Sequence, residues 1–158
     1  MRVINIIKDS VVDGPGLRTT IFFAGCPHHC LGCHNPKSWS VCAGIEMSTN
    51  EVAEHVLQNP INHVTFSGGE PFSQNEKELI YLAKELKNKG RNIWCYTGYV
   101  FEDVVNKEVL KYIDVLVDGK FELEKRNLSL NYKGSENQRI IDVQKSLQSG
   151  DLVLYELE

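Results

Sequence analysis

The 158-residue sequence has no apolar run that approaches the roughly 20 residues needed to cross a bilayer. It also has no basic run or stripe, and its net charge of −4 argues against a nucleic-acid surface. The first ten residues, MRVINIIKDS, become charged too soon to form a signal peptide. We therefore expect a cytoplasmic protein that has neither a membrane nor a nucleic acid as its partner.

Cysteine is scarce and odd in number, with five residues, of which Cys26, Cys30 and Cys33 are clustered. This pattern argues against a disulfide framework, and in a reducing compartment such a cluster is more often metal-binding or catalytic. Three histidines and Cys42 lie close by in the sequence. Seven side chains between Cys26 and Cys42 are therefore candidate metal ligands.

The cluster has the spacing C-x3-C-x2-C, and no second pair of cysteines follows downstream. Structural zinc sites usually combine ligand pairs from two places and complete a shell of four ligands. A cubane iron–sulfur cluster normally takes four cysteines, so three on one loop would leave one iron without a protein ligand. Spacing alone favours the iron–sulfur interpretation, while zinc with Cys42 or a histidine as fourth ligand stays open.

Strand and helix alternate along the chain. Helices are predicted over 48–60, where Ser48 and Glu51 have the capping-box spacing, from Ser73 and Glu76 to Gly90, and over 102–113. Strands are predicted over 2–8, 19–25, 63–69, 92–98, 114–119, 138–143 and 151–157. This order predicts one α/β domain over residues 1–158 with a mostly parallel sheet.

Four unusual loops each follow the carboxyl end of a predicted strand. They are the cysteine loop and the segments Gly68–Pro71, Tyr96–Tyr99 and Asp118–Lys120. The loops at the carboxyl ends of parallel strands lie on one face of an α/β protein, and ligands bind there. The sequence therefore predicts that these four segments converge on one site.

Two motifs together resemble the radical S-adenosylmethionine (SAM) enzymes: the cysteine loop and the turn Gly68–Pro71 that ends the next strand. Three further features resemble the glycyl-radical-enzyme activases within that superfamily, namely the lead-in Gly14–Arg18, Gly32 before Cys33, and Asn35 after it. Stretches spread along most of the chain are most similar to those activases that act on anaerobic ribonucleoside-triphosphate reductase.

The resemblance implies a radical SAM core, which in so short a chain would be a partial, open TIM-like barrel. It implies one 4Fe–4S cluster per chain, held by three cysteines, with SAM bound to the fourth iron. It also implies a reaction: reductive cleavage of SAM gives a 5′-deoxyadenosyl radical, which takes hydrogen from a glycine Cα. The implied partners are the large glycyl-radical reductase and an electron donor such as flavodoxin, and homodimer formation is left open.

The resemblance also implies which residues form the site. The implied metal ligands are Cys26, Cys30 and Cys33. The implied SAM-binding residues are Gly32, Cys33, His34, Gly68, Gly69, Glu70, Asp118 and Lys120.

The remaining polar and aromatic residues near these motifs receive plainer expectations. Thr97 and Tyr99 are as readily explained by the structure of their loop as by SAM binding. Arg18 is expected either to meet a carboxylate of SAM or of a partner, or to have a surface role. His28 and His29 are expected to be solvated loop residues or partner contacts. Buried apolar roles are expected for Cys42 and Cys95, and core or interface roles for Trp39 and Trp94.

Two rival functions remain open at the level of sequence. One is a small radical SAM enzyme that acts on a free metabolite, of the deazaguanine-synthase type. The lead-in Gly14–Arg18 and the sequence Gly32–Asn35 argue against it. The other is a zinc-stabilised interaction module, which the metal content of the protein would distinguish.

Overall fold

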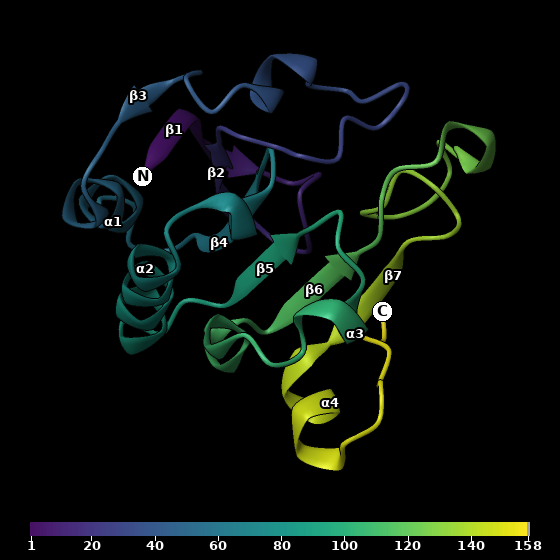
Figure 1. Ribbon diagram of the computed structural model, residues 1–158. Coiled ribbons are helices and arrows are strands. Elements are labelled where there is room, and N and C mark those ends of the chain that lie inside the picture. The colour runs from purple at the N-terminus through teal and green to yellow at the C-terminus, as the bar shows by residue number, and fades with distance from the viewer. Residues whose placement is uncertain (158) are drawn as a thin grey trace.

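The computed structural model describes residues 1–157, which form a mixed α/β fold around one seven-stranded sheet. The strand order is β3-β1-β2-β4-β5-β6-β7 (Figure 1). The strands are β1 (Arg2–Ser10), β2 (Arg18–Phe23), β3 (Ile45–Glu46), β4 (His63–Gly68), β5 (Ile93–Tyr96), β6 (Val115–Asp118) and β7 (Arg139–Asp142). The sheet is open, because β3 and β7 form its two edges.

The four central strands β2, β4, β5 and β6 are parallel, as the alternation of strand and helix predicts. The flanking strands pair antiparallel with their neighbours: β1 with β2, β3 with β1, and β7 with β6. β1 and β7 therefore run against the central strands, and β3 runs with them. The sheet is therefore mixed, with a parallel centre. The open sheet agrees with the expectation that the chain is too short to close a full barrel. The short edge strand β3 is not predicted by the sequence pattern.

Within residues 1–157 the helices are α1 (Thr49–Leu57), α2 (Glu76–Asn88), α3 (Phe101–Val104) and α4 (Val143–Ser149). Short 3₁₀ turns add Pro36–Trp39, Pro71–Ser73, Glu108–Tyr112 and Leu123–Lys125. The capping box that Ser48 and Glu51 predict is present at α1. The capping box predicted from Ser73 and Glu76 is wrong, because Asn75 caps α2 by accepting from the backbone N–H of Glu78.

Two other predictions of secondary structure fail for local reasons. The helix expected over 102–113 is split into α3 and the 3₁₀ turn Glu108–Tyr112. In the tail, the first expected strand is confirmed as β7, but the turn expected after it is replaced by α4. Asp142 caps this helix through the N–H of Lys145, and Gly150 ends it in the left-handed conformation. The second tail strand is reduced to a single bridge between Ile141 and Leu154.

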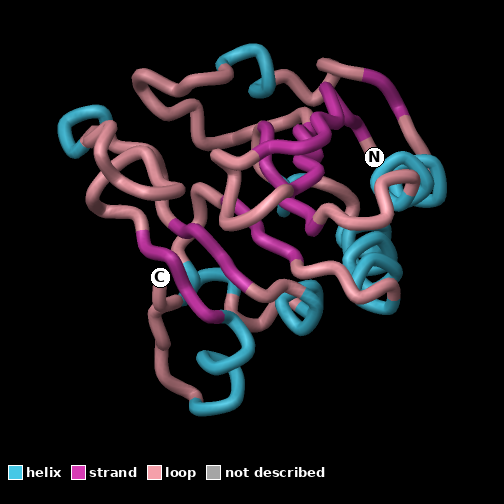
Figure 2. The backbone as a smooth tube through the Cα atoms, turned by 180° about the vertical axis from the view of Figure 1, so that it is seen from behind, coloured by secondary structure: helices cyan, strands magenta, loops and turns pink. Residues whose placement is uncertain are grey.

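The two faces of the sheet bury different side chains, because successive strand residues point to opposite faces. One face carries Phe23, Phe66 and Cys95, and it packs against the apolar sides of α1 and α2. These two helices lie side by side along it (Figures 1 and 2). The other face carries Trp94 and Val117 in a smaller cluster. No helix among the described residues has the length and apolar character that spanning a membrane requires.

Candidate iron–sulfur and cofactor site

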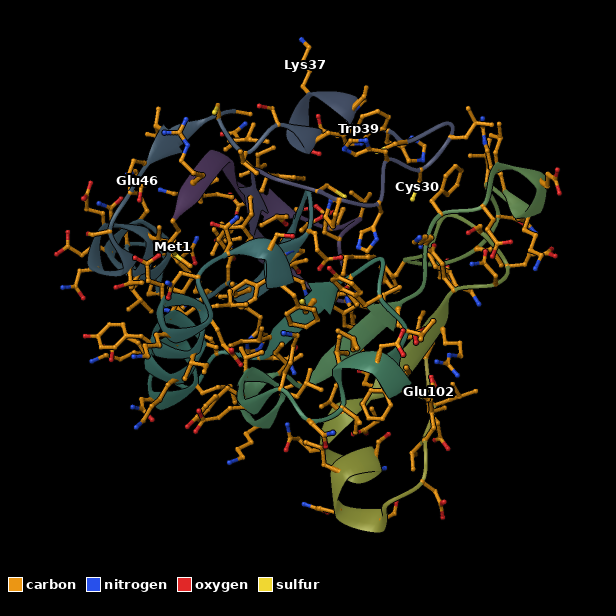
Figure 3. All side chains as sticks on the ribbon, viewed as in Figure 1. Met1, Cys30, Lys37, Trp39, Glu46 and Glu102 are labelled. Carbon is orange, nitrogen blue, oxygen red and sulfur yellow. The ribbon has the colours of Figure 1, made fainter. Side chains whose placement is uncertain are left out.

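The cysteine loop leaves the carboxyl end of β2 and returns through the 3₁₀ turn Pro36–Trp39. Two backbone hydrogen bonds close its neck: the N–H of Gly25 donates to Ser38 O at 2.7 Å, and that of Cys26 to Trp39 O at 3.1 Å. Gly25 has φ of 100°, a left-handed conformation that glycine adopts without strain. Figure 3 shows Cys30 and Trp39 on this segment, which crosses one end of the sheet. The loop is thus fixed where it begins and ends.

The three clustered cysteines are free thiols, each half-buried. Burial raises the pKa of the Cys26 thiol, whereas backbone N–H groups of His28 and His29 act on it in the opposite direction. The sulfur of Cys33 accepts the N–H of Asn35 at 3.4 Å. Hydrogen bonds to cysteine sulfur tune the potential of iron–sulfur clusters, so this contact suits such a ligand.

The donor set fits an iron–sulfur cluster by its chemistry: three accessible thiols on one loop, none of them in a disulfide. Within residues 1–157 no three His, Cys, Asp or Glu side chains are gathered as a metal-ligand set. The histidine rings of the loop contact other side chains, namely those of Tyr99, Trp39 and Phe121. Binding of a cluster by the cysteines would therefore have to bring their thiols together.

The turn Gly68–Pro71 docks directly on the neck of the cysteine loop. The N–H of Gly69 donates to Phe23 O, and that of Glu70 to Gly25 O, both at 2.8 Å. A Cβ on Gly69 would lie 2.6 Å from Gly25 O and 2.8 Å from Ser38 O. Glycine is needed here because two backbones approach closely. The two motifs that carry the resemblance are thus in direct contact.

The Glu70 side chain is completely buried and lies at the centre of a hydrogen-bond network. Its carboxylate accepts from the N–H of Phe72 at 3.1 Å, the hydroxyl of Thr97 at 2.9 Å, and the N–H of Gly98 at 2.8 Å. His28 Nε2 lies 2.6 Å from Glu70 Oε1. One side chain therefore joins the cysteine loop, its own turn and the loop that follows β5.

The expectation of a solvated His28 is wrong, because only 6% of its side chain is exposed. Its ring meets Tyr99 edge to face, with ring centroids 4.6 Å apart. His29 is an exposed residue, and its ring stacks on Trp39 at a centroid distance of 4.5 Å. Neither ring faces the thiols as part of a ligand set.

The other two strand-end segments join the same region. The N–H of Gly119 donates to Tyr99 O at 2.9 Å. Asp118 is 1% exposed and accepts the N–H of Phe101 at 2.8 Å and two donors of Arg139. Lys120, the other predicted residue of this segment, is exposed to solvent.

A cavity of about 740 Å³ opens between these segments. This volume lies within the range of about 300–1,000 Å³ that is usual for small-molecule sites. Three predicted or weighed site residues, Tyr99, Asp118 and Lys120, line it together with His28. Its other lining residues are Gly98, Val100, Glu102, Asp103, Gly119, Glu122, Asn137 and Arg139.

Gly32 and His34 lie on the far side of the cysteine loop, against the segment after β6. A Cβ on Gly32 would come within 2.9 Å of Leu123 Cδ1, and the His34 ring lies 5.6 Å from that of Phe121. These two residues, the cysteines and Gly68–Glu70 are not among those that line the cavity. Of the predicted SAM-binding residues, Asp118 and Lys120 thus line the cavity, and the others lie outside its lining.

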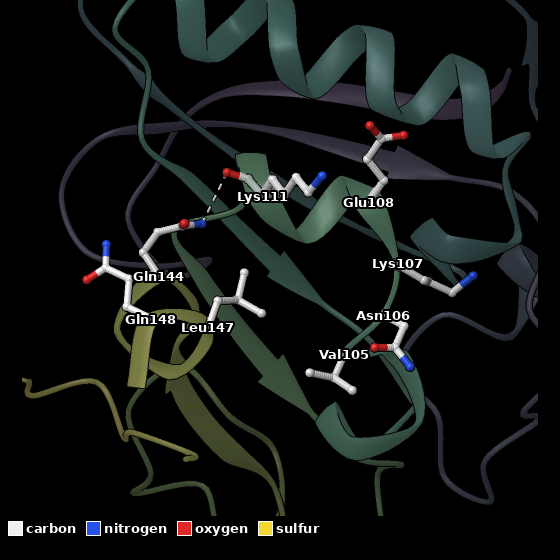
Figure 4. A pocket seen from close by; sticks show the side chains of 8 residues that line it. All are labelled: Val105, Asn106, Lys107, Glu108, Lys111, Gln144, Leu147 and Gln148. Atoms are coloured by element: carbon white, nitrogen blue, oxygen red, sulfur yellow. Dashed lines mark hydrogen bonds between the residues drawn. The ribbon is translucent and has the colours of Figure 1, made fainter. Parts of the chain in front are cut away.

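A second cavity, of about 460 Å³, lies between α4 and the 3₁₀ turn Glu108–Tyr112 (Figure 4). It is lined by Val105, Leu147 and the amide and charged side chains around them. None of the predicted site residues lines it. The cavity at the strand ends is therefore the one that fits the sequence motifs.

Two arginines show where interpretation of the sequence falls short. Arg18 is 2% exposed, so the expected surface role is wrong. It donates to Pro15 O, Val64 O and Asn92 Oδ1 and thereby stabilises the amino end of the sheet. Arg139 escapes prediction, although it holds Asp118. Only the pairing of β7 with β6 brings Arg139 to this place. No signal in the sequence shows that pairing.

The two single cysteines behave differently from each other. Cys95 is fully buried, as expected, and burial holds the pKa of its thiol well above the usual value. Cys42 is exposed, which corrects the expectation that it is buried. Trp94 is a core residue, as expected, and Trp39 is half-buried beside the loop.

Comparison with known families defines the class of protein. The model of the "4Fe-4S single cluster domain" family matches residues 12–141, a span that includes the cysteine loop and the other three strand-end segments. A 4Fe–4S single cluster domain is therefore the class that fold and site define.

Curated relatives make the assignment more specific. A protein of Enterobacteria phage T4 is 39% identical over 135 residues, which are 82% of this chain and 86% of the relative. One of Pasteurella multocida is 36% identical over 152 residues (89% and 96%), and one of Escherichia coli K12 is 34% identical over 140 residues (81% and 90%). All three are named anaerobic ribonucleoside-triphosphate reductase-activating protein. The chain belongs to this family.

Proposed function

We propose that this protein activates an anaerobic ribonucleoside-triphosphate reductase by generating a glycyl radical on it. One observation carries the proposal: the C-x3-C-x2-C loop is hydrogen-bonded at its neck to the turn Gly68–Pro71. Beside this junction a cavity of small-molecule size opens at the strand ends. The relatives' names supply the target, since they are activating proteins of this reductase.

The proposed metal ligands are Cys26, Cys30 and Cys33, each through its thiolate. A 4Fe–4S cluster bound there would supply one electron to SAM, breaking its sulfur–C5′ bond to give methionine and a 5′-deoxyadenosyl radical that takes hydrogen from a glycine Cα of the reductase. Three protein ligands leave one iron for SAM. The electron is proposed to come from a small donor such as flavodoxin.

The proposed SAM-binding residues come from three segments at the carboxyl ends of the parallel strands. Gly32, Cys33 and His34 belong to the loop itself, and Gly68, Gly69 and Glu70 form the turn beneath it. Asp118 and Lys120 contribute from the end of β6, where both line the cavity. The buried Asp118 is fixed, whereas the exposed Lys120 is free to reach an anionic group.

The fold is proposed to serve this chemistry as one domain, a partial barrel of the radical SAM type. Its sheet is open, and an open side suits an enzyme whose substrate is the backbone of another protein. The cofactors would carry the chemistry, and the protein would position them and keep side reactions out.

The experiment that tests the enzyme class is anaerobic reconstitution with iron and sulfide, followed by SAM and a reductant. We expect a brown protein with iron and sulfide that releases methionine and 5′-deoxyadenosine. Replacing Cys26, Cys30 or Cys33 by Ala should abolish iron loading, while Cys42→Ala, at an exposed position, is the matched control. A colourless protein with one zinc would support the rival interaction module instead.

The partner assignment has a separate readout. A large anaerobic reductase added to the reduced, SAM-loaded protein should acquire a glycyl EPR signal. SAM cleavage without that signal would remove the partner from the proposal but keep the enzyme class. Such a result would favour the rival small enzyme that acts on a free metabolite.

A further inference from the structure

We propose that His28 is a positioning residue, which fastens the middle of the cysteine loop to the strand-end loops through Glu70. This inference rests on the proposed function only in that the loop carries the cluster. The attachment itself is a property of the chain and can be measured without any metal.

The contact between His28 and Glu70 is short and buried. His28 Nε2 and Glu70 Oε1 lie 2.6 Å apart, and the side chains are 6% and 0% exposed. A hydrogen bond to a carboxylate is stronger than one between neutral groups, and burial strengthens it further. A surface histidine would gain little from the same contact.

The groups around Glu70 indicate which atom of the His28–Glu70 pair carries the hydrogen that they share. Glu70 Oε1 also accepts hydrogen bonds from the hydroxyl of Thr97 and the N–H of Gly98, and Glu70 Oε2 accepts one from the N–H of Phe72. A carboxylate surrounded by donors acts as the acceptor, so Nε2 of His28 carries the hydrogen. Four protein groups then occupy the roughly four acceptor positions of the carboxylate. Glu70 thus joins these loops through its carboxylate, in addition to its proposed place in the SAM site.

Neighbouring residues are shaped around the His28 ring. A Cβ on Gly98 would lie 2.6 Å from His28 Nε2, although the backbone of Gly98 does not have a positive φ. Glycine is therefore required there by the ring and not by the turn. Tyr99 packs its edge against the same ring, and all three residues line the cavity.

The attachment matters because the cysteine loop has few others. Its neck is held where the loop begins, at Gly25 and Cys26, and where it ends, at Ser38 and Trp39. In the part of the chain that the structure describes, the His28–Glu70 contact is the side-chain hydrogen bond that ties residues 27–32 to another segment. Without it, Cys30 would be held mainly by its own loop. The contact therefore sets where the thiols lie relative to β4 and β5.

The test compares variants at two adjacent histidines. His28→Phe keeps an aromatic ring against Tyr99 and Gly98 but removes the donor. His28→Gln restores an N–H at a similar reach, and His28→Asn is a second loss variant, because its shorter amide cannot reach Oε1. His29→Asn is the matched control: it removes only the stacking on Trp39, and asparagine tolerates the φ of 48° found there.

The first readout is hydrogen exchange of residues 26–34 in the metal-free protein. The loss variants should exchange about tenfold faster or more, the usual effect of losing a charge-assisted hydrogen bond. His28→Gln and the control should stay near the wild type. After reconstitution, the loss variants should bind less iron than the wild type. The addition of SAM should also change the EPR signal of the reduced cluster less in these variants than in the wild type.

The outcomes separate the two proposals. Unchanged exchange in both loss variants, or failure of His28→Gln to restore it, would overturn the role of His28. If His28→Phe does not fold, the comparison of His28→Asn with His28→Gln decides. If the wild type loads no cluster or cleaves no SAM, the proposed function fails, and the exchange experiment still decides on the attachment.

Discussion

Arg139 holds Asp118 at two points: Nε donates to Oδ1 at 3.1 Å and Nη2 to Oδ2 at 2.5 Å. The two residues are cross-strand partners of β7 and β6. Asp118 is buried, and Arg139 also reaches the more exposed Glu102. An antiparallel edge strand thus supplies the cation that fixes a carboxylate at the end of a parallel strand.

Arg139→Ala should lower the free energy of unfolding by about 2–4 kcal/mol, because it leaves the Asp118 carboxylate buried without its charged partner. The partial exposure of Arg139 keeps the loss at the lower end of that range. Glu102→Gln is the control and should cost less than about 1 kcal/mol, as for other exposed pairs. Urea unfolding measures both, and equal losses would contradict the two-point contact as the stabilising element.

Arg18→Lys should destabilise the protein by about 2 kcal/mol or more, since lysine cannot reproduce the guanidinium fork toward three acceptors. Arg18 lies at the amino end of β2, away from the cysteine loop. The folded variant should therefore bind SAM as the wild type does. Urea unfolding and equilibrium dialysis with labelled SAM measure the two effects. Weaker SAM binding with unchanged stability would contradict this account and would indicate that Arg18 takes part in SAM binding.

Gly69→Ala should cost about 1–3 kcal/mol through overpacking against the carbonyl oxygens of Gly25 and Ser38. The same clash should loosen the neck of the cysteine loop. Hydrogen exchange of Gly25 and Cys26, whose N–H groups close the neck, should become faster. The docking of the two motifs would be contradicted by an alanine variant as stable and as protected as the wild type.

His63 should make stability sensitive to mild acid. Burial lowers the pKa of His63, and nearby Arg18 and Arg91 act in the same direction. Its Nδ1 accepts the N–H of Asn92 at 2.8 Å, which requires the neutral ring. The contribution is complete above the unfolded pKa of about 6.5 and is lost as the pH falls below it towards the folded pKa.

The matched variant is His63→Asn, whose Oδ1 can accept the same N–H without titrating. Between about pH 7 and pH 5 the wild type should lose more stability than this variant. Urea midpoints at several pH values measure the difference. Parallel pH profiles would show that His63 does not titrate differently in the folded chain.

Much of the parallel centre of the sheet could be predicted, because each strand is a short buried apolar run followed by glycine or a turn. The segments 19–25, 63–69, 92–98 and 114–119 all contain strands. Helix α4 escaped prediction, although Asp142 and Gly150 are ordinary cap residues. Its few apolar residues leave little periodicity to find.

The candidate site was predictable as a set of loops but not as a set of contacts. Strand order places the cysteine loop beside Gly68–Pro71, so their meeting follows from topology. The burial of His28 does not, because a histidine between two cysteines gives no sign of a carboxylate that lies 42 residues further along the chain. Arg18 was misjudged and Arg139 escaped prediction for the same reason, because their partners are distant in sequence.

The most direct test of the central claim follows one hydrogen atom. The reductase partner is prepared with glycine deuterated at Cα, and the reduced, reconstituted protein is supplied with SAM. The account predicts that the 5′-deoxyadenosine released carries deuterium from the partner and that the partner shows a glycyl EPR signal. Unlabelled 5′-deoxyadenosine from a partner that shows no glycyl signal would contradict it.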